Sequence, residues 1–296
     1  MASAIFHIEG GIGKHVAATA VVNAYKNTYP DKEIVVVCAW PEIFLGNNDI
    51  ARVYRIGNVP YFYRDFIQGR KDVEIFGHDP YRETLHITKQ NHLIDTWCKM
   101  VGVKRNKGNL NLNFNIREQE SIDPELSKIK KTKPVLIFQP FGGPGKEHQQ
   151  HPYSWVRDIH PKVAQELVNK LHEKYMIIHV CYDFHPSLNN VIRYEKSVAK
   201  KELFNLLRYS DKRLLIDSSL QHAAAAMGLS STVVWIGTSP NVFGYKEHTN
   251  ITPPKKFLKG HIDSYLYDYN FTGVMHECPY KDINDLHSID KILSNF

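Results

Sequence analysis

The side chains best suited to chemistry lie in a short polar segment of the C-terminal half. An apolar run ends there in Asp217, Ser218 and Ser219, and a stretch of small residues follows from His222 to Gly228. This order predicts a strand, a polar turn and then a helix. Asp217 and Ser218 can cap the helix, whose N-terminus then lies at the carboxyl end of a strand, where open α/β sheets bind ligands. The N–H groups and dipole of the helix favour an anion such as a diphosphate.

A second polar turn follows the next apolar run, residues 232–236. Together the two turns resemble the sugar-nucleotide site of heptosyltransferase-like glycosyltransferases of family 9. That family combines an Asp-Ser/Thr-Gly-x-x-His-x-Ala-Ala-Ala segment with an apolar strand and a Gly-Pro-Thr-x-Pro turn. Eight residues fall on these positions, while Ser219 replaces the usual glycine: Asp217, Ser218, His222, Ala224, Ala225, Gly237, Thr238 and Pro240.

The resemblance implies a site for a nucleoside-diphosphate sugar donor, without a cofactor or a metal ion. The residues expected to contact the donor are Asp217, Ser218, Ser219, His222 and Thr238, together with Gly13 and with Gly143 and Lys146 of a second glycine-rich turn that begins at Phe141. Backbone N–H groups of that turn and the Lys146 cation would stabilise the departing diphosphate. Asp183 follows an apolar run where the family contacts the base or ribose, and its position also suits an ordinary turn.

A further glycine-rich turn, residues 9–15, follows the first apolar run of the chain. It does not match a P-loop, because Ile8 occupies the first glycine position and His15 the position of the Mg²⁺-binding hydroxyl. It also misses the dinucleotide fingerprint, since Val16 stands at the last glycine position. The turn and the helix after it resemble the corresponding segment of the heptosyltransferase-like family through Gly13, Val16, Thr19 and Ala20.

The catalytic aspartate of that family falls at Lys14. A lysine is not a general base at neutral pH unless its pKa is strongly lowered. His15 is one alternative base, because its ordinary pKa is near neutral and the helix start favours its neutral form. Glu9, at the end of the strand, is another, and Lys14 can instead neutralise an anionic acceptor or the diphosphate. His15 equally suits an ordinary exposed or capping residue.

Composition limits the class of protein. The chain has 296 residues, 43% hydrophobic and 23% charged, so we expect a packed soluble protein with two domains. No apolar stretch approaches the roughly 18 residues of a membrane span, and no signal-peptide pattern opens the chain. We therefore expect a cytoplasmic protein, while peripheral contact with a membrane stays open. The four cysteines are scattered, which fits a reducing compartment, and Cys38 and Cys181 lie in apolar runs that predict buried thiols.

The formal net charge of +6 suits an anionic substrate. The Lys and Arg residues are dispersed along the chain, so a nucleic-acid partner is permitted but not indicated. Sixteen histidines are present without any spacing typical of metal ligands, and we predict no metal site.

Strands and helices alternate twice along the chain, which predicts two doubly wound α/β domains. The first half contains expected strands at 4–8, 33–38, 53–56 and 73–76, helices at 16–29 and 86–101, and a short strand and loop at 106–115. The second contains expected strands at 135–140, 176–181, 214–216 and 232–236, and helices at 159–175, 201–209 and up to Gly228. The resemblance implies the GT-B fold, in which two Rossmann-like domains face a central cleft.

The expected domain limits are 1–120 for the acceptor-side domain, 121–133 for a linker and 134–280 for the donor domain. Residues 281–296, by resemblance, form a C-terminal helix that returns to the first domain. The predicted function is metal-independent and inverting transfer of a sugar from a nucleoside-diphosphate donor to a hydroxyl of a glycan, lipid-linked saccharide or other acceptor. Three alternatives stay open: a degenerate nucleotide-sugar-binding protein, another two-domain enzyme such as a sugar-nucleotide epimerase, and a transferase acting on a modified nucleic-acid base.

Overall fold

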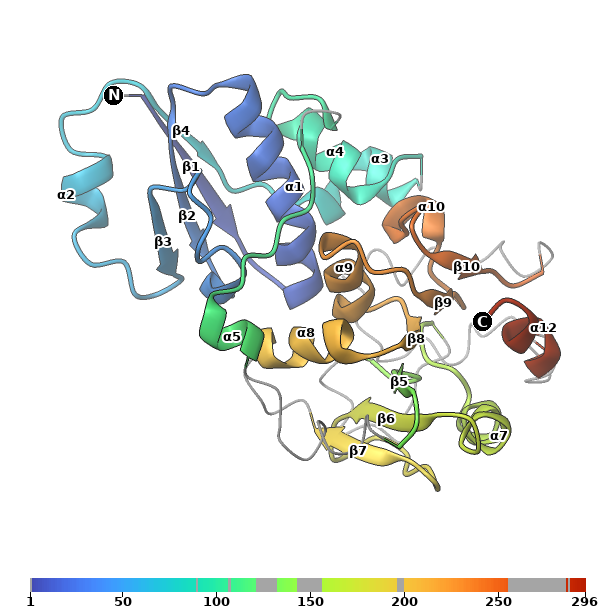
Figure 1. Ribbon diagram of the computed structural model, residues 1–296. Coiled ribbons are helices and arrows are strands. Elements are labelled where there is room, and N and C mark those ends of the chain that lie inside the picture. The colour runs from blue at the N-terminus through green and yellow to red at the C-terminus, as the bar shows by residue number, and fades with distance from the viewer. Residues whose placement is uncertain are drawn as a thin grey trace. The chain divides into compact units, whose positions relative to one another are not determined.

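The structure is a computed structural model that describes residues 2–88, 90–105, 108–120, 132–142, 156–195, 200–254, 286 and 288–296. The chain divides into two compact units, Met1–Arg117 and Glu118–Phe296. Each unit is built on a sheet whose strands are all parallel (Figure 1). The predicted pair of parallel α/β units is confirmed, and the central cleft stays a prediction.

The first unit contains a four-stranded sheet in the order β3-β2-β1-β4. Its strands are β1 (Ser3–Ile8), β2 (Glu33–Cys38), β3 (Arg52–Arg55) and β4 (Val73–Phe76). Its helices are α1 (Ile12–Thr28), α2 (Phe62–Phe66), α3 (Thr84–Ile87) and α4 (Leu93–Met100), with short 3-10 turns η1 (Pro41–Ile43) and η2 (Pro80–Arg82); α5 (Ile116–Glu120) stands at the boundary of the units.

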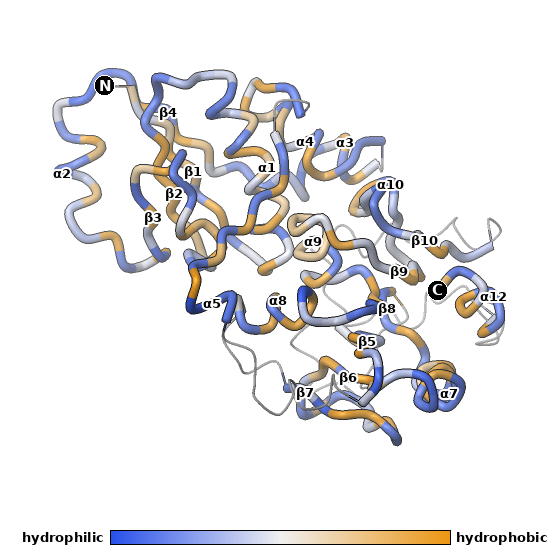
Figure 2. The backbone as a smooth tube through the Cα atoms, viewed as in Figure 1, coloured by the Kyte–Doolittle hydropathy of each residue, from blue (hydrophilic) through white to orange (hydrophobic). Residues whose placement is uncertain are grey.

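Alternation along β1 builds the core of the first unit on both faces of its sheet. Ile5 packs with Val35, Tyr54 and other residues on the face that α2 covers. On the other face, the ring of Phe6 lies 5.4 Å from that of Tyr25 in α1, in an edge-on arrangement. Figure 2 shows how hydrophobic residues gather along β1 and β2. The continuous apolar runs predicted from the sequence are therefore strands buried on both faces.

Three expectations for the first unit differ from the structure. Helix α1 begins at Ile12, because Gly11 is its N-cap and the glycine-rich turn already forms its first residues. The expected helix 86–101 is two helices, since the extended backbone at His92 interrupts it and the His92 ring caps α4 by accepting the N–H of Ile94. Residues 108–115 form no strand, because their backbone bonds to side chains of α1, as from Asn111 N–H to Thr19.

The second unit contains a six-stranded sheet in the order β10-β9-β8-β5-β6-β7. Its strands are β5 (Val135–Phe138), β6 (Met176–Cys181), β7 (Ile192–Glu195), β8 (Lys212–Ile216), β9 (Thr232–Val234) and β10 (Thr249–Ile251). Its helices are α7 (Pro161–Leu171), α8 (Lys200–Tyr209), α9 (Ser219–Ala226), α10 (Pro240–Phe243) and α12 (Ile289–Ser294). The sequence patterns did not reveal the short elements β7, α10 and β10, which have little periodicity.

The last helix, α12, packs on the second unit. Ile292 is buried in the same hydrophobic cluster as Val163 of α7 and Val234 of β9. Asn295 accepts a hydrogen bond from the Thr232 hydroxyl through its carbonyl oxygen. The apolar face of α12 therefore completes the core of the second unit, and the expected return of residues 281–296 to the first domain stays a prediction. The predicted linker 121–133 lies outside the described residues except for 132 and 133.

Strand order gives each sheet one topological switch point. In the first unit the chain moves outwards from β1 through β2 to β3 and then returns to the other side of β1 as β4. In the second it moves from β5 through β6 to β7 and returns to the other side of β5 as β8. Open α/β sheets bind ligands beyond the carboxyl ends of such adjoining strands. We call the β1/β4 edge the first switch point and the β5/β8 edge the second.

Candidate functional site

The second switch point contains a buried carboxylate. Asp217 directly follows β8, and its residue is only 6% exposed. Burial raises the pKa of Asp217 above its ordinary value, while the positive charge of Arg157 and polar contacts with Thr238 and Gln221 oppose this rise. A carboxylate accepts hydrogen bonds, so the hydroxyl groups of a sugar or ribose are suitable partners for it.

Two serines follow at the start of α9. Ser218 is the N-cap, and its hydroxyl accepts the N–H of Leu220 and donates to the side-chain oxygen of Gln139, just after β5. This bond ties together the ends of the two strands that form the second switch point. Ser219, the first residue of α9, is half-buried, and its hydroxyl makes no hydrogen bond to the described residues. The N-terminus of α9 therefore offers a hydroxyl and a helix dipole to an anion.

The loop after β5 approaches the same point. A Cβ atom added to Gly142 would lie 3.2 Å from Cδ1 of Ile216 and 4.0 Å from Cβ of Ser218. The absence of a side chain therefore lets this loop pass close to the start of α9. The Gly142 N–H donates to the carboxylate of Asp158 at 3.0 Å. Gly143 and Lys146, the predicted phosphate-binding residues, lie outside the described residues.

The remaining predicted donor residues follow or lie near strands of the second sheet and differ in burial. His222 is buried in α9, where its Nδ1 lies 2.7 Å from the Tyr245 hydroxyl. Thr238 is 1% exposed and follows β9, beside β8. Asp183 follows β6, on the opposite side of β5 from Asp217, and its exposed carboxylate accepts the N–H of Phe184. The structure thus brings Asp217, Ser218 and Ser219 together, with Thr238 in polar contact with Asp217, and places Asp183 one strand away from the switch point.

At the first switch point, His15 has a structural role. Its residue is fully buried, its Nδ1 lies 2.9 Å from the carbonyl oxygen of Gly11, and its Nε2 accepts the N–H of Ala39. Burial lowers the pKa of His15 to about 4. Burial and these contacts favour a structural role for His15, while its role as a general base, which needs a lone pair within reach of an acceptor hydroxyl, stays a prediction.

Glu9 and Gly13 show contrasting exposure in the same turn. Glu9 follows β1 with an exposed carboxylate, 3.8 Å from Nε2 of His7. Gly13 is half-buried in the first turn of α1, whose N-cap Gly11 offers no side-chain hydrogen bond. Both therefore stay near the carboxyl end of β1, as the sequence predicted.

Lys14 pairs with a residue that sequence reasoning missed. Its residue is 5% exposed, and its ammonium donates to Oδ1 of Asp79 at 2.8 Å. The same ammonium lies 5.0 Å from the ring centroid of Tyr81 and 5.8 Å from that of Trp97. Asp79 follows β4, so the ion pair links the two strands of the first switch point. A Gly-His-Asp segment directly after an apolar run was the available signal.

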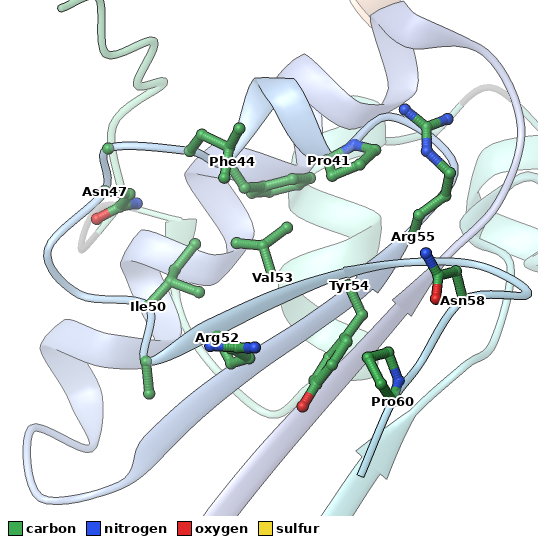
Figure 3. Close-up of a pocket in the computed structure, with 13 residues that line it drawn as sticks. Pro41, Phe44, Asn47, Ile50, Arg52, Val53, Tyr54, Arg55, Asn58 and Pro60 are labelled. Carbon is green, nitrogen blue, oxygen red and sulfur yellow. The ribbon is translucent and has the colours of Figure 1, made fainter. Parts of the chain in front are cut away.

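The first unit also has an open hollow beside its edge strand β3. It has a volume of about 470 Å³ and is lined by Phe44 and Val53, with Arg52, Arg55 and Asn58 among its polar residues. Figure 3 shows Val53 pointing towards Phe44 across the hollow, and Arg55 extending towards Pro41. Apolar walls with guanidinium and amide groups suit a polar ligand that carries a negative charge.

The structure matches many solved structures, three of which cover most of the chain. A family 9 glycosyltransferase from Veillonella parvula matches with a TM-score of 0.67 and 11% identity, covering 99% of this chain and 95% of that one. The ADP-heptose lipopolysaccharide heptosyltransferase II of E. coli matches with 0.57 and 12%, covering 86% and 91%. The E. coli heptosyltransferase WaaC with ADP matches with 0.57 and 12%, covering 87% and 95%.

The chain has a heptosyltransferase-like fold. No family model and no curated protein matches its sequence. At 10–12% identity the likeness concerns the fold, and the chemistry has to be argued from this chain's own residues. None of the described helices has both the length and the apolar character needed to cross a membrane.

Proposed function

We propose that this chain is a glycosyltransferase that moves a sugar from a nucleoside-diphosphate donor to a hydroxyl of an acceptor, with inversion and without a metal ion. The supporting observation is the second switch point. There a buried carboxylate, Asp217, lies beside the N-terminus of α9 and the glycine loop after β5. Few ligands need both a carboxylate and a helix N-terminus. A nucleotide sugar has hydroxyls that can donate to the carboxylate and a diphosphate that the helix N-terminus can bind.

In this proposal the second unit binds the donor and the first unit binds the acceptor. The Asp217 carboxylate accepts hydrogen bonds from donor hydroxyls, while Ser219 and the N–H groups of α9 bind the diphosphate. Lys146 neutralises the departing diphosphate, and Gly143 allows the backbone to approach it. The acceptor binds to the first unit, whose hollow beside β3 offers Arg52 and Arg55. The fold similarity to heptosyltransferases supports this reading.

A binding protein without transfer activity is the second candidate function. Its support is the first switch point, where Lys14 replaces the family's catalytic aspartate and His15 is sealed inside the unit. Donor binding with no transfer to any hydroxyl acceptor would favour it.

We place either function in the cytoplasm. The chain's thiols support that placement, since Cys38 and Cys98 are buried and form no disulfide with the described residues. Burial also raises the pKa of Cys38 to about 12, so the thiol is unreactive.

A thermal-shift panel of ADP, UDP, GDP and CDP, free and as their sugars, tests donor binding. A ligand at about 100 times its Kd should stabilise the protein by about 2.7 kcal/mol. In Ser219→Asp the added charge favours the dipole of α9 but repels a diphosphate, so the melting temperature should hold and the ligand shift should disappear. Ser288→Asp adds the same charge at the N-cap of α12 and should leave the ligand shift intact. No shift with any nucleotide in the wild type would overturn the proposed function.

A further inference from the structure

Resting on the proposed function, we propose that Asp79 is the general base that removes the proton from the acceptor hydroxyl, and that Lys14 is its positioning residue. The geometry points to this pair because it is the one charged cluster among the described residues that joins both strands of the first switch point. Neither the fold similarity nor the sequence pattern assigns a role to Asp79.

Strand pairing sets the height of Asp79 above the sheet. Strands β1 and β4 are parallel, and Phe6 pairs with Phe76 in their register. The chain leaves β1 after Ile8 and enters α1, while on the other side it leaves β4 after Phe76 and reaches Asp79 three residues later. Both loops therefore emerge at the same carboxyl edge, where ligands of open α/β sheets bind.

Asp79 combines a fixed position with an accessible oxygen. Its Oδ1 accepts hydrogen bonds from the Lys14 ammonium at 2.8 Å and from the Tyr81 N–H at 3.0 Å. The side chain is 27% exposed, and among the described residues nothing donates a hydrogen bond to its Oδ2. One oxygen thus orients the carboxylate, and the other is open to an acceptor hydroxyl. A general base needs hydrogen-bond reach to the proton it takes, and this arrangement provides it.

Lys14 fixes the orientation of the Asp79 carboxylate. The ammonium lies near the rings of Tyr81 and Trp97, which restrict where it can move. A buried ammonium is costly without an anionic partner, so Asp79 is retained beside it. The other two candidates lack this combination, since His15 is fully buried and, among the described residues, the nearest charged partner of the Glu9 carboxylate is His7 at 3.8 Å.

The chemical step balances without a further reactant. The acceptor hydroxyl gives its proton to Oδ2 of Asp79 as its oxygen forms a bond to the anomeric carbon of the donor sugar. The bond from that carbon to the diphosphate oxygen breaks, and its electron pair leaves on the diphosphate. Asp79 then releases the proton to solvent. The single displacement inverts the anomeric centre.

The test compares kcat for transfer with donor binding in Asp79→Asn. The amide keeps an oxygen for the Tyr81 N–H but cannot take a proton, so kcat should fall about 100-fold or more. The Kd for the nucleoside diphosphate should stay within about threefold of the wild type, because the donor residues lie in the second unit. Glu33→Gln is the matched control, since Glu33 forms an ion pair with Arg70 at the amino end of β2 and should keep kcat.

Asp79→Asn leaves the buried Lys14 ammonium without its anionic partner and can therefore impair folding. Two further variants separate such a folding defect from the loss of a general base. Lys14→Met leaves Asp79 without its holder, and we expect kcat to fall about 10-fold. Lys14→Met/Asp79→Asn removes both charges and should fall at least another 10-fold with the same melting temperature. Equal kcat in these two variants, or loss of transfer in Glu9→Gln with full activity in Asp79→Asn, would overturn the assignment. A wild type that binds no nucleotide would instead refute the proposed function itself.

Discussion

The two switch points share one topology and carry opposite charge arrangements. At the second, a carboxylate is buried, and burial raises the pKa of Asp217. At the first, the buried group is an ammonium, Lys14, and its carboxylate partner Asp79 is partly exposed. At the second switch point Ser218 caps α9 with its side chain, whereas at the first α1 begins at Ile12 after Gly11, which offers no side-chain cap.

The difference suggests that the two edges are built for different tasks. Burying a carboxylate costs free energy because it loses its hydrogen bonds to water. Such a group suits a ligand held in one position, whose hydroxyls replace those hydrogen bonds. A carboxylate with one oxygen held and the other open suits a group that exchanges a proton with solvent. Under the proposed function, the second switch point holds the donor and the first performs the proton transfer.

Asp217→Asn tests the second switch point and should have a larger effect than His15→Leu or Arg52→Gln. Replacing the carboxylate should lower kcat/KM about 100-fold, since the donor hydroxyls lose a charged acceptor worth about 1.5–3 kcal/mol. The melting temperature of the free protein at pH 7 should rise, because the raised pKa means that the charged form destabilises the fold. For a domain of this size, 1 kcal/mol corresponds to about 2–4 °C.

The stability difference between Asp217→Asn and the wild type should depend on pH. Stability linked to protonation of Asp217 is fully present below its unfolded pKa of about 3.9 and is lost as pH rises through the raised folded value. The advantage of the amide should therefore be largest at neutral pH and vanish in acid. Asp211→Asn, at the amino end of β8, is the control and should keep turnover. Lower stability with intact turnover in Asp217→Asn would assign Asp217 a structural role.

The two switch points also differ in how much the sequence revealed. Asp217, Ser218 and Ser219 are consecutive, so one local pattern predicts the strand, the cap and the helix that bring them together. Asp79 and Lys14 are 65 residues apart, and they meet only because β4 pairs with β1 rather than with β3. Strand order depends on packing of the whole unit, and no local pattern contains it.

Burial was the other quantity that the sequence did not reveal. His15 looked suitable as a base because of its ordinary pKa and its place at a helix start. Its burial depends on Ala39 beyond β2, on Ile8 and on Phe44, whose ring centroid lies 6.3 Å away. The parallel units were predictable, since continuous apolar runs separated by helices leave few other folds. Short elements such as β10 and η2 were not.

His15→Leu sharpens the comparison by removing the buried histidine without changing the charge pair. Loss of its backbone hydrogen bonds should destabilise the protein by about 1–3 kcal/mol at pH 7, while kcat per folded molecule stays within about threefold. A fall in kcat of about 100-fold with an unchanged melting temperature would support the general-base interpretation.

Acid should reduce the difference between His15→Leu and the wild type. Lowering the pKa of His15 from 6.5 to about 4 corresponds to roughly 3 kcal/mol, at 1.36 kcal/mol per pKa unit. This stability is present above pH 6.5 and is lost as pH falls through 4, because the unfolded chain binds the proton first. Urea unfolding of both proteins between pH 7 and pH 4 measures the effect.

Arg52→Gln should have the smallest effect and tests whether the first unit binds the acceptor. The guanidinium lines the hollow beside β3 and lies 5.5 Å from the ring centroid of Tyr54. Loss of one exposed charge should raise KM for an anionic acceptor about threefold, which is below 1 kcal/mol, and leave KM for the donor unchanged. Arg64→Gln is the matched control, because Arg64 also lies over a tyrosine ring, that of Tyr61, but does not line the hollow. Equal effects of Arg52→Gln and Arg64→Gln would mean that the acceptor senses only the net charge of the unit, and the hollow would lose its role.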